Sequence, residues 1–161
     1  MAKDLLEDLF ERRDAWRKEM NEALTLVSVE DAPWETNKQG KMQWYLHPAL
    51  MNKMGLRTLL VWRQEIPAGS HSGKQRTQGG ILHYVLKGKG YTVLDGVRHD
   101  WEAGDAIVFP FKWNGVEYQH FNVDMSEPLL MIATMLNQLD IIGVDQGCGF
   151  EQMENAPEYR G

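Results

Sequence analysis

Cysteine is almost absent from the sequence: Cys148 is the only one among 161 residues. A single cysteine excludes an internal disulfide and suits a reducing compartment. Long apolar runs are missing too, since none approaches the roughly 20 residues of a membrane-spanning helix. The amino terminus is acidic and amphipathic, where a signal peptide would be basic and then apolar. These absences predict a cytoplasmic protein without a membrane partner.

Positive charge is also scarce. The chain carries 17 Lys and Arg residues against 23 Asp and Glu residues, which gives a formal net charge of -6, and it has no basic cluster. Because negative charge repels phosphate backbones, nucleic acid is not an expected partner. The residues that are present are ordinary for a globular protein, with 43% hydrophobic and 25% charged side chains. This length and composition predict one domain with a proper core.

Short apolar segments closed by turns fill residues 69–122. Gly88 ends one segment, Gly104 precedes another, and Asp95-Gly96 is a dipeptide suited to a two-residue hairpin. This spacing is typical of meandering antiparallel strands rather than βαβ units. Because many short strands expose their edges unless the sheets close, the pattern predicts an all-β jelly-roll barrel.

The sequence on either side of this stretch extends the barrel. Further strands are predicted over residues 42–46, 59–66 and 129–135. The chain then divides into an N-terminal helix and linker, a barrel and a C-terminal tail, over residues 1–40, 41–136 and 137–161.

Apolar residues recur at mostly helical spacing between Asp4 and Leu24, with charged residues between them. They predict an amphipathic helix whose apolar stripe either packs on the outside of its own barrel or crosses to another subunit. The tail is punctuated by glycines, which disfavour a regular element. Its apolar side chains favour docking, on the barrel or on a partner. These side chains are Ile141, Ile142, Phe150 and Met153.

The glycine and proline spacing of the barrel resembles the cupin family. The frame of the family's first motif fits without a gap and falls on Gly69, Gln75, Thr77, Ile81 and Gly88. The second motif falls on Gly104, Pro110, Gly115, Tyr118 and Asn122, with three extra residues between its proline and the next glycine. The resemblance implies the jelly-roll barrel, or double-stranded β-helix, of that family.

In cupins, two histidines, a glutamate and a third histidine hold a metal at four of these positions, a donor set suited to Fe(II), Mn(II) or Ni(II). This chain has Gln75, Thr77, Ile81 and Tyr118 there. Glutamine and threonine are weak neutral donors, isoleucine donates nothing, and a phenol with a pKa of about 10 is a poor ligand at neutral pH. We therefore expect no metal, no other cofactor and no catalytic residue on this chain.

A substituted metal site is the alternative. His71, Glu117 and His120 lie near the two motif turns and would have to converge to bind an ion. His83 is not expected to join them. Strand alternation places it on the face of Ile81, so it points inward only if Ile81 does.

The stretches 72–80, 88–92, 95–96 and 115–122 resemble ring-cleaving dioxygenases of the gentisate and hydroquinone type. The narrowest resemblance is to the small subunits of two-component hydroquinone 1,2-dioxygenases, short cupins that accompany a larger iron-bearing chain. It implies a non-catalytic subunit of a hetero-oligomer, with Fe(II) on the larger cupin-type catalytic partner. Two other functions stay open. One is a single-chain metalloenzyme that uses His71, His120 and Glu117, and the other is a metal-free cupin that binds a small molecule at the barrel mouth.

Overall fold

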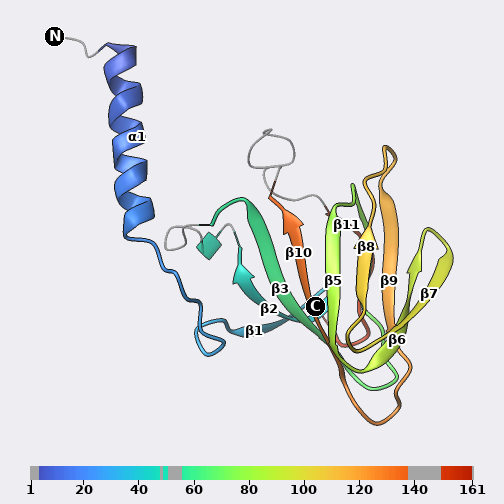
Figure 1. Cartoon of the computed structure of the whole chain (residues 1–161). Coiled ribbons are helices and arrows are strands. Elements are labelled where there is room, and N and C mark those ends of the chain that lie inside the picture. Colours follow the sequence, from blue (N-terminus) through green and yellow to red (C-terminus); the bar gives the residue numbers. More distant parts are fainter. Residues whose placement is uncertain (1–3, 48, 51–55, 138–149, 161) are drawn as a thin grey trace.

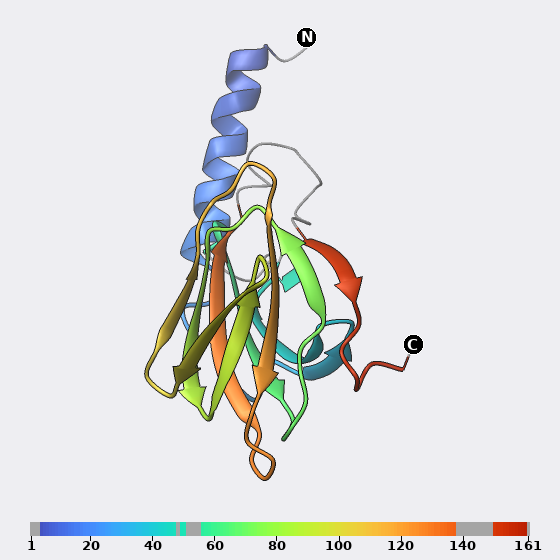
Figure 2. The same cartoon turned by 90° about the vertical axis from the view of Figure 1, so that its right-hand side faces the viewer.

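Two antiparallel β-sheets that face each other form the body of the protein (Figures 1 and 2). The computed structural model describes residues 4–47, 49–50, 56–137 and 150–160. One sheet has six strands in the order β1-β2-β3-β10-β5-β8, and the other has five in the order β11-β4-β9-β6-β7. The all-β jelly-roll barrel predicted from the turn spacing is confirmed.

The strand bounds agree closely with the predicted segments. The six-stranded sheet consists of β1 (Trp34–Asn37), β2 (Gly40–Leu46), β3 (Leu59–Ile66), β10 (Leu129–Leu136), β5 (Ile81–Lys87) and β8 (Ala106–Phe109). The five-stranded sheet consists of β11 (Phe150–Glu154), β4 (Lys74–Thr77), β9 (Val116–Asn122), β6 (Lys89–Leu94) and β7 (Val97–Glu102).

The turn between β6 and β7 has the geometry that its sequence predicts. Asp95 has φ 49° and Gly96 has φ 81°, and a type I′ hairpin requires positive φ at both positions. The carboxylate of Asp95 also accepts a hydrogen bond from the backbone N–H of Glu117 at 2.8 Å. The hairpin is thereby fastened to β9, the strand that carries Tyr118 and His120.

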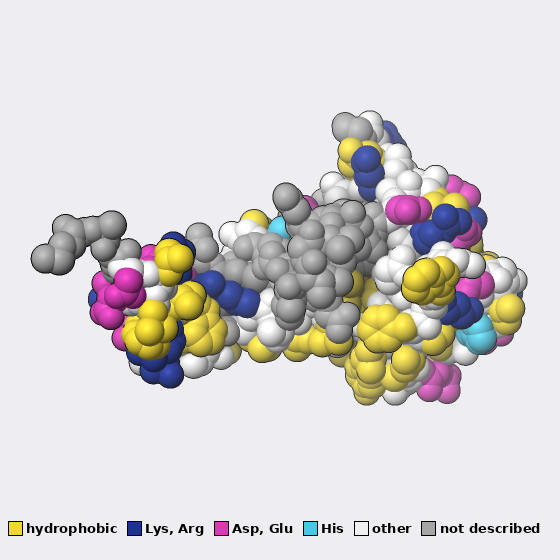
Figure 3. Space-filling view, turned by 90° about the horizontal axis from the view of Figure 1, so that it is seen from above, with side chains coloured by type: hydrophobic (Ala, Val, Ile, Leu, Met, Phe, Trp, Pro, Cys, Tyr) yellow, Lys and Arg dark blue, Asp and Glu magenta, His cyan; other side chains and the backbone are white. Residues whose placement is uncertain are grey.

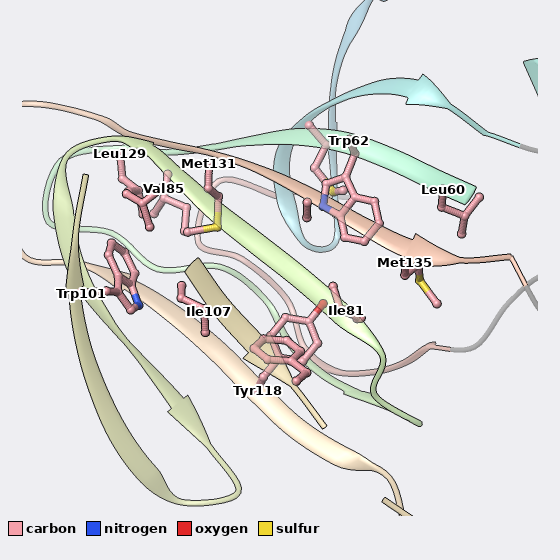
Figure 4. Close-up of a cluster of buried hydrophobic side chains, with 14 residues drawn as sticks. Leu60, Trp62, Ile81, Val85, Trp101, Ile107, Tyr118, Leu129, Met131 and Met135 are labelled. Carbon is pink, nitrogen blue, oxygen red and sulfur yellow. The ribbon is translucent and has the colours of Figure 1, made fainter. Parts of the chain in front are cut away.

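The core lies between the two sheets and follows the period-two alternation of the strands. Every second side chain of β3 and of β10 is buried. Figure 4 shows core side chains from both sheets in one cluster, with Leu60 and Met135 at one end of it and Trp101 at the other. Fully burying one such side chain contributes about 1.5–3 kcal/mol.

The predicted N-terminal helix forms as α1 (Leu5–Asn21) and stands away from the barrel (Figures 1 and 2). Asp4 caps it by accepting a hydrogen bond from the backbone N–H of Glu7 at 2.8 Å. None of the α1 residues is buried. The expectation that the stripe packs on its own barrel is therefore wrong. The described contact with the barrel is an ion pair of 2.5 Å between Glu19 and Arg57. No helix of the described ranges is long and apolar enough to cross a membrane.

Strands that pair with the barrel lie on both sides of the predicted range 41–136. Residues 1–40 are not only helix and linker, because β1 lies within them and pairs with β2. The tail over residues 137–161 also contains a strand, β11, which pairs with β4 and places Gln152 opposite Gln75. Docking of this part of the tail is therefore on the chain's own barrel. Ile141 and Ile142 lie outside the described residues.

Candidate functional site

The four family ligand positions lie in the barrel and carry a hydrogen-bonded pair instead of a metal-binding set. Gln75 on β4 lies opposite Tyr118 on β9, and the Tyr118 hydroxyl donates to Gln75 Oε1 at 2.6 Å. Burial raises the pKa of Tyr118 far above its usual range, so the phenol stays neutral. Thr77 and Ile81 are buried nearby, and Ile81 offers only carbon atoms. The residues present do not fit the divalent metal of the family.

The hydrogen bonds continue from Gln75 toward the rim. Gln75 Nε2 donates to Gln152 Oε1 at 2.8 Å, and Gln152 Nε2 donates to Gln39 Oε1 at 3.4 Å. Gln152 Nε2 also reaches the carbonyl of Lys38 at 3.1 Å. We call Tyr118, Gln75, Gln152 and Gln39 the mouth cluster. Along this series each side chain donates a hydrogen bond to the next one. Three of the four members are neutral amides.

A cavity of about 300 Å³ opens at the mouth cluster. Trp44, Trp62, Tyr118 and Met42 supply its apolar surface, and amides supply its polar surface. Among the described residues no carboxylate lines it, and Lys38 is the one charged residue in that lining. Its size is at the lower end of the range for small-molecule pockets.

Behind the mouth cluster lie two buried histidines that we call the histidine pair. His83 on β5 and His120 on β9 are both 0% exposed, and their ring centroids are 4.6 Å apart. His120 Nδ1 lies 2.8 Å from the Thr92 hydroxyl, which also accepts a hydrogen bond from Trp101 Nε1 at 2.8 Å. His120 Nε2 and both ring nitrogens of His83 have no hydrogen-bond partner within the described parts of the chain.

Burial keeps the histidine pair uncharged. Desolvation lowers the pKa of His120 to about 3. Desolvation, and then the neighbouring His120, hold the pKa of His83 well below its usual value. The expectation that His83 would stay apart from His120 is wrong. Ile81 points inward at 1% exposure, so alternation brings His83 inward with it.

The structure does not bring His71, His120 and Glu117 together as a substituted metal site. The His71 ring lies against Phe121, and its Nδ1 is 3.1 Å from Gln119 Nε2. Glu117 pairs with Arg76 on the outer side of β9, which lowers the pKa of Glu117. His120 points the other way, into the barrel. Among the described residues no group of three His, Cys, Asp or Glu side chains could hold a metal ion.

Sequence reasoning missed the residues that complete the pocket. Gln39 lies in the turn between β1 and β2, and Gln152 lies on β11, both outside the recognised motifs. Gln75 and Gln152 are 77 positions apart in the sequence. No local pattern indicates that they meet. For His83 the signal existed, because its inward position follows once Ile81 is assigned to the core.

The structure combines a jelly-roll barrel with a pocket lined by aromatic and amide side chains. The motif positions that hold metal ligands in cupins carry other residues here. Residues 62–135, just under half of the chain, match the family described as Cupin domain. The comparison with curated proteins found no match.

Solved structures support the fold assignment. The polyketide cyclase RemF of Streptomyces resistomycificus is similar with a TM-score of 0.57 and 14% identity, over 70% of this chain and 79% of that one. A variant of Streptomyces PAC13 with uridine has a TM-score of 0.56 and 14% identity, over 84% and 99%. A predicted oxalate decarboxylase of Thermotoga maritima has a TM-score of 0.54 and 20% identity, over 70% and 98%. At these identities the likeness shows the fold alone.

Proposed function

We propose that this chain is the small, non-catalytic cupin subunit of a cytoplasmic, Fe(II)-dependent aromatic ring-cleaving dioxygenase of the hydroquinone 1,2-dioxygenase type. In this proposal a larger cupin-type chain carries the iron and the catalytic residues. The observation that carries it is the hydrogen bond between Tyr118 and Gln75, two of the family's ligand positions. A neutral phenol bonded to a neutral amide offers poor ligands for Fe(II) at these two positions.

The exposed helix supports a role in assembly. Leu5 is 83% exposed, Leu9 62% and Trp16 53%, although all three belong to the apolar stripe of α1. Figure 3 shows hydrophobic side chains gathered on the helix, at the left of the view, among acidic and basic ones. A solitary helix of about this length is marginal in water, and packing of its apolar face supplies most helical stability. A partner chain would supply the surface that the barrel does not.

The alternative of a single-chain metalloenzyme loses its basis in this geometry. It requires His71, His120 and Glu117 around one ion, and they lie on different sides of β9. Enzymes occur among the structurally similar proteins, but the likeness to them extends only to the fold. A single-chain metalloenzyme is therefore not retained as a second candidate.

Co-expression with a larger cupin-type chain tests the proposed assembly. We expect the two chains to co-elute in size-exclusion chromatography with light scattering, with iron in the complex and on the larger chain. The double variant Leu9→Asp, Trp16→Asp should weaken association by about 100-fold or more, because each buried side chain contributes at least about 1.5 kcal/mol.

The matched control changes the polar face of the same helix, with Glu7→Gln and Lys18→Gln. We expect these substitutions to leave association unchanged while circular dichroism reports the same helix content for both variants. A full-length chain that stays a monomer with the larger chain present would contradict the subunit role. Equal association of the Leu9, Trp16 variant and the control would contradict the role of the stripe.

A further inference from the structure

The pocket at the barrel mouth has no part in the subunit role, yet the chain builds it from added segments. Six of its nine lining residues lie outside the cupin match over residues 62–135. They are Asn37, Lys38, Gln39, Met42, Trp44 and Gln152. The turn between β1 and β2 and the docked strand β11 therefore supply most of the pocket lining from outside the matched residues.

One lining residue presents a hydrogen-bond donor that nothing satisfies. Gln39 is 5% exposed, and its Oε1 already accepts from Gln152. Its Nε2 is buried and has no partner in the part of the chain that the structure describes. A buried amide N–H without an acceptor is costly, whereas the other amides of the mouth cluster are paired. A bound molecule with an acceptor atom would complete the cluster.

The backbone at Gly73 lies close to the side chains of Gln152 and Gln39. A Cβ atom there would lie 2.3 Å from Gln152 Nε2, 2.4 Å from the Lys38 carbonyl and 2.7 Å from Gln39 Oε1. Any larger residue would collide with both amides and with the Lys38 carbonyl. Glycine at this position therefore allows Gln152 and Gln39 to meet.

The walls of the pocket select the shape and charge of its occupant. Trp44 and Trp62 lie side by side, with ring centroids 5.6 Å apart and an interplanar angle of 47°. The indole N–H of Trp44 already donates to Glu35 at 2.8 Å, so this ring offers its apolar surface. Aromatic surfaces favour a planar ring as a neighbour. No carboxylate from the described part of the chain lines the pocket, so a cation would gain no counter-charge from this lining.

We propose that this pocket binds a planar, single-ring, uncharged molecule whose oxygen acceptor receives a hydrogen bond from Gln39 Nε2 while its ring lies against Trp44 and Trp62. Aryl amides, aldehydes and phenols belong to this class. The site stands independently of the proposed subunit role, because it rests on the cavity and the free donor alone.

Benzamide is the probe, and the full-length chain is the protein. Saturation-transfer NMR and calorimetry should show saturable binding with a Kd of about 1 mM or below, a modest affinity for a ligand of this size. Benzamidine has the same shape but is a cation and carries donors in place of the carbonyl, so we expect it to bind at least about tenfold more weakly. Cyclohexanecarboxamide keeps the carbonyl without the flat ring, and it should also bind more weakly.

Variants locate the site. Gln39→Met removes the free donor, while Gln152 keeps the Lys38 and Glu154 carbonyls as acceptors. This change should weaken benzamide about tenfold. Gln119→Met is the matched control, because Gln119 is a buried glutamine on β9 whose amide bonds His71 and Ser72 outside the pocket.

Thermal unfolding checks that both variants fold before binding is measured. Saturable benzamide binding that Gln39→Met weakens and Gln119→Met leaves unchanged would support the site. The proposal is overturned if benzamide shows no saturable binding to the folded chain. It is also overturned if benzamidine binds as well as benzamide, or if Gln39→Met binds benzamide as well as the unaltered chain does.

Discussion

At the mouth of the barrel, Tyr118 donates a hydrogen bond to Gln75, and Gln75 donates one to Gln152. One step deeper, His83 and His120 face each other with three of their four ring nitrogens unpartnered in the described structure. Both groups are polar and enclosed by the same two sheets. The comparison shows that Tyr118, Gln75 and Gln152 pair with one another, whereas the neighbouring histidine pair leaves most of its ring nitrogens without a partner in the described structure.

The difference follows from what each group can reach. Amides carry both donors and acceptors, so a run of glutamines from β4, β11 and the β1–β2 turn can pair with itself. The histidine pair is surrounded by Trp62, Phe109 and Tyr118 rings, which offer few acceptors. Burying these unpartnered nitrogens costs stability, and the packing of the two histidine rings in the core offsets part of that cost.

The largest expected effect is on the pH dependence of stability. Both histidines have folded pKa values below the usual 6.5, so the unfolded chain binds protons that the folded chain does not. Stability should be fully present above about pH 6.5 and fall as the pH drops below it. The loss by pH 5 should be about 2 kcal/mol for each histidine, or about 4 kcal/mol for the pair.

Urea unfolding at pH 7, 6 and 5 measures this dependence. The carboxylates with lowered pKa, such as Asp95 and Asp124, titrate below this window and do not interfere. The double variant His83→Leu, His120→Leu should lose most of the dependence. A stability that stays flat between pH 7 and pH 5 in the unaltered chain would show that the pair is not buried and neutral as described.

The next effect tests the contrast directly, because the same kind of substitution should act with opposite sign in the two groups. Gln75→Leu leaves the buried Tyr118 hydroxyl and Gln152 Oε1 without partners, and should cost about 1–3 kcal/mol. His83→Leu removes two unpartnered nitrogens, and should leave stability unchanged or raise it by about 1 kcal/mol. Denaturant unfolding at pH 7.5 compares them. Equal costs for both substitutions would remove the distinction between the hydrogen-bonded Gln75 and the unpartnered His83.

The smallest effect on stability is expected for a side chain on the outer surface of the barrel. Glu117 lies in a partly exposed ion pair with Arg76, so Glu117→Gln should leave the midpoint of thermal unfolding nearly unchanged. The remaining difference should shrink as salt is added. A large loss of stability in high salt would instead indicate a buried role for this carboxylate.

Much of the fold could be predicted from local signals. Asp95-Gly96 specifies a hairpin by its tolerance of positive φ, and the alternating segments around it specify inward and outward faces. The helix was predicted from its apolar periodicity. Its position was not, because a stripe indicates that a surface is needed and not which surface provides it.

The candidate site was only partly accessible to sequence reasoning. Gln75 and Tyr118 were identified as altered ligand positions, but their mutual hydrogen bond depends on the register of β4 against β9. Gln39 and Gln152 could not be found, because their meeting depends on the docking of β11. Such long-range pairing leaves no periodic trace in a glycine-rich tail.

Tyr118 and Gln75 bond each other at two of the cupin ligand positions, so we expect this chain to hold no iron there. The most direct measurement is the metal content of the purified chain after anaerobic incubation with excess Fe(II) and removal of unbound ions, read by plasma mass spectrometry. We expect substoichiometric iron in the unaltered chain, and the same in Tyr118→His, because one restored ligand does not make a three-ligand site. One iron per chain in the unaltered protein, lost on substitution of Gln75 or Tyr118, would contradict the account.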